Sequence, residues 1–374
     1  MSDIDYYEEV RTKLEMGPLF APKHEATYEI MKILWNEEEI KILYHFPKAY
    51  DPIGIQELAE KTGIPKAQLK TTLNRLSEKG TLSKKGSKFS LMTLAPGVFE
   101  RYYCERKDTE ENLTKAAVIF RKIMDDILPQ LLMEAKVKLM RPLLPIDAKE
   151  KLIQIDTTIN TKSQVLPHEI AEEIINKYDY FATVPCQCRL LGEYSGEPCK
   201  RAPAELGCLF CGLMGQVTVE LGWGKELTKQ EAIEHLRKAE KAGLVHHTVD
   251  DISAESKLFI CNCCSCHCGV LSPSKKSRIY ATNPSNYRPE RDNTLCVKCG
   301  TCMEKCPMDA IFHIYPRKTD SSDEHMLLRD EYCIGCGVCA VNCPNNAIKM
   351  VKISDSIPQK HLKLGTKSFL ELLM

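Results

Sequence analysis

Between residues 296 and 344 the chain carries the same cysteine pattern twice. Each copy has three cysteines at intervals of three residues, then a fourth cysteine four residues later, and then a proline. The second copy follows the first by 37 positions without a gap, and an Ala-Ile pair recurs at Ala310-Ile311 and Ala347-Ile348. An ungapped internal repeat predicts two similar halves. The first copy contains Cys296, Cys299, Cys302 and Cys306, and the second contains Cys333, Cys336, Cys339 and Cys343.

This spacing favours iron–sulfur clusters. Three cysteines that are three residues apart can surround one corner of an iron–sulfur cube, and the fourth, before the proline, reaches the other cube. We therefore predict one [4Fe–4S] cluster on Cys296, Cys299, Cys302 and Cys343, and a second on Cys333, Cys336, Cys339 and Cys306. The segment resembles bacterial two-cluster ferredoxins. A pair of four-cysteine zinc sites is the alternative, but zinc requires neither the third cysteine nor the proline.

The glycines of the repeat and the overall cysteine content agree with this interpretation. Gly300, Gly335 and Gly337 suit loops whose backbone approaches inorganic sulfide closely. Of 19 cysteines in 374 residues, 18 lie between Cys186 and Cys343. Clustered cysteines without a secretion signal indicate metal ligation in a reducing compartment rather than disulfides. We expect a cytoplasmic protein of an anaerobic host.

Charge and hydropathy exclude few functions. The formal net charge is zero, so no global field favours nucleic acid or a membrane surface. Apolar residues make up 43% and charged residues 27%, as in ordinary soluble proteins. The acidic N-terminus lacks the apolar run of a signal peptide, and no apolar stretch approaches the 18 residues that a bilayer-spanning helix needs.

A second cysteine-rich region precedes the repeat. Its ten cysteines suffice for two four-cysteine centres with two left over. In an extended Cys261–Cys268 segment, Cys261 and Cys263 would face one side and Cys264, Cys266 and Cys268 the other. One or two further [4Fe–4S] clusters, structural zinc, and an unusual cluster with an open iron site are the open alternatives. The ten are Cys186, Cys188, Cys199, Cys208, Cys211, Cys261, Cys263, Cys264, Cys266 and Cys268.

Histidines near these cysteines are further candidate ligands. His267, His246 and His247 could bind metal, but we interpret them as ordinary loop or surface residues. The C-x-C-R and C-N-C-C-x-C motifs, followed by Asn283–Tyr287 and the repeat, resemble a family of [4Fe–4S]-binding proteins of strict anaerobes. The resemblance covers about residues 180–350 and implies metal binding without indicating a reaction.

The N-terminal part resembles the winged-helix domains of prokaryotic regulators. We predict a helix from Ile33 to Tyr44, a second over Ile55–Lys61, and a third from Pro65 to Lys79 that ends at Gly80. Two strands around Lys84-Lys85-Gly86 would form the wing. Docking to protein is favoured over binding to DNA, although seven basic residues against one acidic residue form a local basic patch. These seven are Lys66, Lys70, Arg75, Lys79, Lys84, Lys85 and Lys88.

A long helix follows, predicted from Thr109 to Met140 with a kink at Pro129.

The predicted fold class is α+β multidomain, with an N-terminal winged helix-turn-helix, a central cysteine-rich α/β region and a C-terminal ferredoxin-like domain with two [4Fe–4S] clusters. The predicted boundaries are an arm over 1–30, the winged helix over 31–105, a linker helix over 106–145, the metal-binding region over 146–275 and the ferredoxin domain over 276–374.

No nucleotide-binding fingerprint and no nucleophile–base pair stands out in the sequence. We therefore expect an iron–sulfur electron-transfer protein that is a subunit or electron donor of an anaerobic oxidoreductase rather than a stand-alone enzyme. A redox- or iron-sensing winged-helix transcriptional regulator is the alternative, and a reductase with an unusual central cluster is the third. The expected partner is a redox protein; the long helix leaves a homodimer open.

Overall fold

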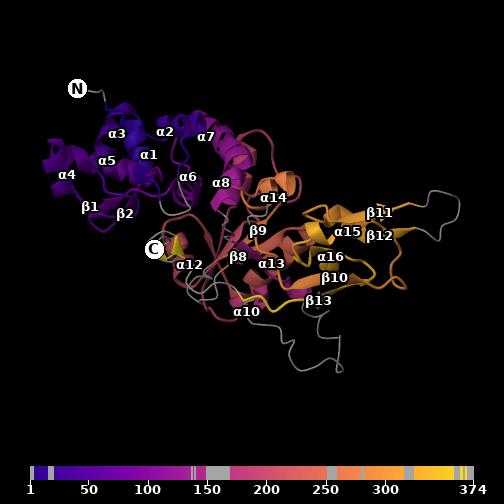
Figure 1. The fold of residues 1–374 in the computed structure, drawn as a ribbon. Coiled ribbons are helices and arrows are strands. Elements are labelled where there is room, and N and C mark those ends of the chain that lie inside the picture. Colours follow the sequence, from indigo (N-terminus) through magenta and orange to yellow (C-terminus); the bar gives the residue numbers. More distant parts are fainter. Residues whose placement is uncertain are drawn as a thin grey trace. The chain divides into compact units, whose positions relative to one another are not determined.

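The structure, a computed structural model, divides into two compact units (Figure 1). The first comprises residues 1–128, 190–198 and 362–374, and the second comprises 129–189 and 199–361. Both units mix helices with antiparallel sheet. The residues described are 4–15, 21–135, 138, 140–148, 169–250, 259–278, 282–315, 324–357, 363–364 and 367–368.

The first unit contains short helices, a three-stranded sheet and the two-stranded pair β14–β15. Strand β1 pairs with β3, and β3 pairs with β2, all antiparallel. Leu69, Leu73 and Leu76 form the buried face of α5, as their helical spacing requires. The elements are α1 (Tyr6–Lys13), α2 (Glu25–Leu34), α3 (Glu37–Leu43), β1 (Ile53–Gly54), α4 (Ile55–Thr62), α5 (Lys66–Glu78), β2 (Ser83–Lys85), β3 (Lys88–Ser90), η1 (Leu94–Val98), α6 (Phe99–Glu105), α7 (Glu110–Lys122), η2 (Ile123–Ile127), β14 (Lys363–Leu364) and β15 (Lys367–Ser368).

The predicted helices over 55–61 and 65–79 are present as α4 and α5. The predicted single helix from Ile33 to Tyr44 is wrong, because the chain breaks at Trp35 and restarts at α3. Asn36 caps α3 in a capping box with Glu39, which satisfies backbone N–H groups that a continuous helix would bond internally. A local cap therefore overrides the apolar periodicity.

The predicted helix from Thr109 also ends earlier than expected. It runs as α7, then η2 with wider hydrogen bonding, then α8 (Leu128–Ala135), and Met140 already lies in strand β4 (Met140–Pro142). Pro129 has no N–H for the helical ladder, and the irregular turn η2 lies directly before it. The irregular turn thus lies close to the predicted kink at Pro129, and the sequence placed the end of the helix too late.

The second unit is organised on a six-stranded sheet in the order β4-β8-β9-β6-β5-β7, in which every pair is antiparallel. Its strands are β4, β5 (Phe181–Val184), β6 (Cys208–Cys211), β7 (Lys225–Leu227), β8 (Val245–Val249) and β9 (Phe259–Cys263). Helix α13 (Lys229–Ala242) packs on the sheet through Ala232 and Leu236. Thr228 and Glu231 form a capping box at the start of α13, and Gly243, with positive φ, ends the helix.

The rest of the second unit carries short elements around the cysteine repeat. Strand β10 pairs with β13 and β11 pairs with β12, each antiparallel (Figure 1). The remaining elements are α10 (Ala171–Ile175), α11 (Gln187–Tyr194, which continues into the first unit), α12 (Gly212–Glu220), α14 (Leu271–Ser277), β10 (Tyr287–Arg291), α15 (Thr301–Lys305), β11 (Ile311–Ile314), β12 (His325–Leu328), η6 (Asp330–Tyr332), α16 (Val338–Val341) and β13 (Ile348–Lys352).

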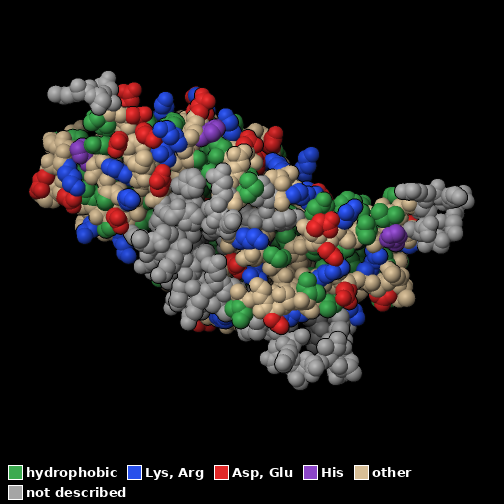
Figure 2. Space-filling view, viewed as in Figure 1, with side chains coloured by type: hydrophobic (Ala, Val, Ile, Leu, Met, Phe, Trp, Pro, Cys, Tyr) green, Lys and Arg blue, Asp and Glu red, His purple; other side chains and the backbone are tan. Residues whose placement is uncertain are grey.

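Within the described part of the chain, no helix combines the length and the apolar character needed to cross a membrane. On the face shown in Figure 2, Lys and Arg side chains are interspersed with Asp and Glu side chains. This agrees with the balanced composition.

Candidate metal centres

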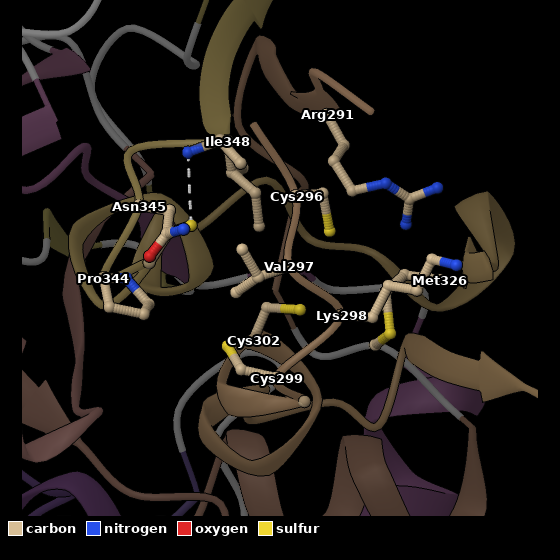
Figure 3. Close-up of a pocket in the computed structure, with 13 residues that line it drawn as sticks. Arg291, Cys296, Val297, Lys298, Cys299, Cys302, Met326, Pro344, Asn345 and Ile348 are labelled. Carbon is tan, nitrogen blue, oxygen red and sulfur yellow. Dashed lines mark hydrogen bonds between the residues drawn. The ribbon is translucent and has the colours of Figure 1, made fainter. Parts of the chain in front are cut away.

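The first pocket of the repeat brings together the four cysteines of one predicted cluster. Cys296, Cys299, Cys302 and Cys343 all line it, together with apolar Val297 and Ile348 (Figure 3). Cys296 and Cys299 come from the loop that leads into α15, Cys302 lies in the first turn of α15, and Cys343 follows α16 of the other half. The Ala347 N–H donates to Cys343 Sγ at 3.3 Å. Four thiols around one apolar pocket fit the donor set of a [4Fe–4S] cluster.

The second pocket has the reciprocal composition. Cys333, Cys336 and Cys339 line it with Cys306, the last cysteine of the first copy. The Ala310 N–H donates to Cys306 Sγ at 3.2 Å, so both crossing cysteines accept the same kind of backbone hydrogen bond. The structure thus groups the eight cysteines as the spacing predicts, and their role as cluster ligands remains a prediction that this geometry fits.

The thiols of the two pockets differ in their environment. Cys299 is exposed, and its hydrogen bond with the Thr301 hydroxyl, at 3.4 Å, lowers the pKa of its thiol. In the second pocket burial raises the pKa of Cys333 to about 11 and raises the pKa of Cys336 further. Because cluster ligands are thiolates, the second set must release protons when it binds metal.

Glycines in the repeat have positive φ, and at Gly335 neighbouring protein atoms leave no room for a side chain. Its φ is 68°, and a Cβ there would lie 2.2 Å from the Tyr287 carbonyl oxygen. The close approach is to protein backbone, and the Ser285 hydroxyl donates to the Gly335 carbonyl at 2.6 Å. Gly335 therefore joins the repeat to the segment before β10.

Six of the ten central cysteines form a ring at one end of the large sheet. Val184 of β5 pairs with Cys208 of β6, and β9 runs beside β6, so the cysteine-bearing ends of these strands lie together. Each ring thiol has two others within hydrogen-bonding range, and Cys208 Sγ lies 3.6 Å from Cys261 Sγ. In ring order the six are Cys186, Cys208, Cys261, Cys263, Cys268 and Cys188.

A separate, compact group lies beyond the end of β9. Its potential donor atoms, from Cys199, Cys264, Cys266 and His267, all lie within 4.8 Å of one another. Cys199 Sγ and Cys266 Sγ are 3.3 Å apart. His267, which we interpreted as an ordinary loop or surface residue, is buried in a turn, and its imidazole lies within this group. The C-x-C-H run from Cys264 to His267 was the available signal.

The predicted alternation along Cys261–Cys268 fails at Cys268. Strand β9 ends at Cys263 and a turn follows, which reverses the period-two pattern and returns Cys268 to the ring of Cys261 and Cys263. The tenth cysteine, Cys211, lies in the apolar core with Phe181, where burial raises its pKa to about 12. The expected two sets of four with two left over thus become six thiols, three thiols with a histidine, and one core residue.

Arg189 lies between the ring and the compact group, and the sequence motif alone gave it no role. Its side chain is fully buried. Nε donates to the Pro203 carbonyl at 3.1 Å, Nη1 donates to the Asn262 carbonyl at 2.8 Å, and Nη2 donates to the Leu206 carbonyl. Burial alone would lower the pKa of Arg189, but the surrounding cysteines, Cys186 and Cys264 first, outweigh burial and raise it. The guanidinium therefore places a fixed positive charge beside both groups.

Both neighbouring histidines are buried in β8, contrary to our interpretation as surface residues. His246 Nδ1 lies 2.7 Å from Asn262 Oδ1, and its Nε2 lies 3.1 Å from Glu240 Oε1. Burial lowers the pKa of His247 to about 4, so His247 is neutral at pH 7. Both thus stabilise the core beside the ring, and neither belongs to the compact group.

Hydrogen bonds around the start of β10 connect the dicluster region to the rest of the second unit. Asn286 Nδ2 donates to Glu169 Oε1 at 2.5 Å, and the Tyr287 hydroxyl donates to Glu169 Oε2 at 3.0 Å. All three side chains are buried. Farther along, the Asn342 side chain donates to the Glu240 carbonyl of α13 at 2.9 Å.

Comparison with known families agrees with the geometry of the two pockets. The family described as 4Fe-4S dicluster domain matches residues 290–350. Residues 290–350 are a ferredoxin-type 4Fe-4S dicluster domain. No curated protein and no solved structure shows significant similarity to the chain. The dicluster domain holds both cysteine pockets, whereas the ring and the compact group lie outside the matched residues.

Proposed function

We propose that the chain is an iron–sulfur electron-transfer protein, a cytoplasmic subunit or electron donor of an anaerobic oxidoreductase. The observation that carries the proposal is the pair of four-cysteine pockets in the dicluster domain. When bound there, [4Fe–4S] clusters accept and release single electrons. The protein supplies the thiols, the apolar surroundings and the distances between the centres.

The packing of the second unit supports a relay of several centres. One continuous buried cluster includes Cys263 and Cys268 of the ring together with Cys302 and Cys336 of the dicluster domain. Apolar side chains such as Leu271 belong to the same cluster and exclude water from the region between the centres. This shared packing supports the proposal that a centre in the ring would extend the relay beyond the dicluster domain.

Exposure around the first pocket supports electron exchange with a partner at that end. Leu295, Val297 and Met303 are 46%, 62% and 40% exposed, and Cys299 is the exposed cysteine of the set. Apolar side chains around a cluster allow close approach of a partner protein, because they are easily desolvated. The second pocket, with buried Cys336 and Cys339, would exchange electrons mainly through the first.

The test follows electrons through the full chain, purified without oxygen. We expect dithionite to reduce the wild-type protein and the reduced protein to pass its electrons to cytochrome c. A variant with Cys296→Ala and Cys302→Ala should lose most of this transfer while the second pocket keeps its iron. Cys104→Ala, in the first unit, is the control. Transfer at the wild-type rate by the double variant would contradict the first pocket as the outlet, and absence of reducible iron in all samples would refute the function.

A transcriptional regulator is the second candidate, and the order of elements favours retaining it. Helices α3, α4 and α5 followed by the β2–β3 hairpin and paired with β1 are the elements of a winged helix. Two members of the predicted basic patch are engaged within the unit, however. Arg75 lies 2.5 Å from Glu39 and Lys79 lies 2.9 Å from Asp108. This supports a docking role over DNA binding.

We expect the protein to give no sequence-selective mobility shift with its own upstream DNA at physiological salt, in either redox state. The reason is that two of the seven basic residues of the patch, Arg75 and Lys79, are already paired with carboxylates within the unit, which leaves fewer cations to neutralise phosphates. If binding does occur, exchanging Lys70, Lys84, Lys85 and Lys88 for Ala should abolish it and flatten its salt dependence. Tight, redox-dependent binding by the wild type and its loss in this variant would instead establish the regulator.

A reductase with an unusual central cluster is the third candidate, favoured by the ring alone. Six thiols exceed the four that one [4Fe–4S] cluster uses. A centre in this ring therefore differs in its ligand set from the two in the dicluster domain.

A further inference from the structure

We propose that Cys199, Cys264, Cys266 and His267 hold a single zinc ion, distinct from every iron–sulfur centre of the chain. The proposal does not depend on electron transfer. It assigns the compact group a different metal and a structural role.

The size of the group fits one ion. In a tetrahedral site with Zn–S bonds of about 2.3 Å, neighbouring sulfurs lie roughly 3.8 Å apart. The four potential donors here all lie within 4.8 Å of one another, and Cys199 Sγ is 3.3 Å from Cys266 Sγ. Cys264 is in hydrogen-bonding range of both Cys199 and Cys266, so the three thiols form a closed triangle. His267 also contacts Cys264 and supplies the fourth corner.

The other cysteines of the second unit provide an internal comparison. Each thiolate of a [4Fe–4S] cluster binds a different iron, so its four ligands must surround the cube and cannot converge on one point. Among the described residues, only the compact group brings three or more potential metal donors within 4.8 Å of one another. The cysteines of the two dicluster pockets do not lie this close together. In the ring each thiol meets two others without closing a triangle. In the part of the chain that the structure describes, the compact group is therefore the one with the spacing of a mononuclear site.

The donor types select zinc. Three thiolates with one imidazole are a standard closed, four-coordinate combination for structural zinc. Such a site leaves one net negative charge on the divalent ion and its ligands, and the buried guanidinium of Arg189 supplies a compensating positive charge nearby. Apolar Ala202, Leu244 and Leu206 pack around the thiols and would keep the ion from full hydration.

The proposed ion would join two segments that are distant in sequence. Cys199 begins the loop that leads to β6, and the other three ligands lie in the turn after β9. Arg189 already holds these segments together, since it donates to carbonyls in the loop, at Pro203 and Leu206, and to Asn262 of β9. A metal at the compact group would fix the same junction a second time. Closing loops with a metal is how small structural zinc sites stabilise irregular chain.

The test measures metals in the full chain, expressed anaerobically in medium containing both iron and zinc. We expect about one tightly bound zinc per chain in the wild type. Cys199→Ser and His267→Ala should each lose most of that zinc while the iron content stays unchanged. His235→Ala, which alters a histidine outside the group, should keep both metals. Because these readouts count metals, failure of the zinc site and failure of the electron-transfer function are separate results.

A second measurement distinguishes the ion's ligands from a general folding defect. His267→Cys should retain zinc, since four thiolates also form a structural zinc site. With cobalt in place of zinc, the wild type should show the visible absorption of tetrahedral Co²⁺, and His267→Cys should shift that absorption by exchanging nitrogen for sulfur. Wild-type protein with no zinc, or iron loss in Cys199→Ser equal to a whole cluster, would overturn the proposal. An unshifted cobalt spectrum in His267→Cys would exclude the imidazole as a ligand and overturn the assigned set.

Discussion

Exchange of Cys306 for alanine is expected to remove the iron held by Cys333, Cys336 and Cys339 and to spare the iron held by its own motif. The reason is that the Cys306 thiol lines the second pocket, although the residue belongs to the first copy of the repeat. About four of the roughly eight irons of the dicluster domain should be lost, or the affected cluster should be converted to a three-iron form. Iron analysis combined with EPR of the dithionite-reduced protein measures this.

The reciprocal variant provides the matched comparison. Cys343→Ala should damage the cluster of Cys296, Cys299 and Cys302, because the Cys343 thiol lines the first pocket. The core residue Cys211, exchanged for alanine, should leave the iron content unchanged. If Cys306→Ala instead loses the signal of the first pocket, each motif is self-contained and the crossed assignment is wrong.

A large loss of stability is expected when Arg189 is replaced by methionine. Methionine fills a similar volume but leaves three carbonyl oxygens without their donor and removes the positive charge beside the thiols. Removing one partner from a buried charged network costs about 3–5 kcal/mol. For a unit of this size the melting temperature should fall by on the order of 10 °C. Anaerobic thermal unfolding of the metal-loaded chain, followed by circular dichroism, is the measurement.

The control for this variant is an arginine at the surface of the same unit. Arg237 forms an ion pair with Asp147 at 3.1 Å, but its side chain is 38% exposed. Exposed pairs contribute at most about 1 kcal/mol, so Arg237→Met should change the melting temperature little. Arg189→Lys keeps the positive charge but cannot donate to all three carbonyls in the geometry of a guanidinium. Its melting temperature should therefore lie between those of Arg189→Met and Arg237→Met. Equal melting temperatures for Arg189→Met and wild type would show that the guanidinium does not stabilise the junction.

The dicluster domain could be predicted from the sequence, because the spacing of its cysteines already indicates the kind of cluster that they would bind. Loops with cysteines every third residue leave few other ways to arrange the thiols, and the structure groups them accordingly. The ends of helix α13 are also marked in the sequence, since Thr228 with Glu231 and Gly243 are local signals that act within one helix. Where a signal is complete within a few residues, the sequence suffices.

The central centres could not be read in the same way, because their ligands come from segments that only the sheet brings together. Cys208 meets Cys261 because β6 lies beside β9, a pairing that no local pattern reveals. The side that Cys268 faces depends on where β9 ends, one turn before it. Arg189 follows a cysteine motif, but its three hydrogen-bond acceptors are backbone carbonyls. Every residue has a backbone carbonyl, so the sequence could not indicate which ones Arg189 would bind.

The buried carboxylate of Glu169 has a consequence for anyone who wishes to graft this cluster-binding module onto another protein. It accepts hydrogen bonds from Asn286 and Tyr287, both of which precede the residues that match the family. Gly337, inside the match, faces Pro145, whose ring a Cβ would approach to 2.7 Å. Excising residues 290–350 would therefore remove buried contacts with the rest of the second unit and expose the side chains that make them. A graft would therefore need the residues of the second unit that pack against the module, Pro145 and Glu169 among them, as well as the matched residues.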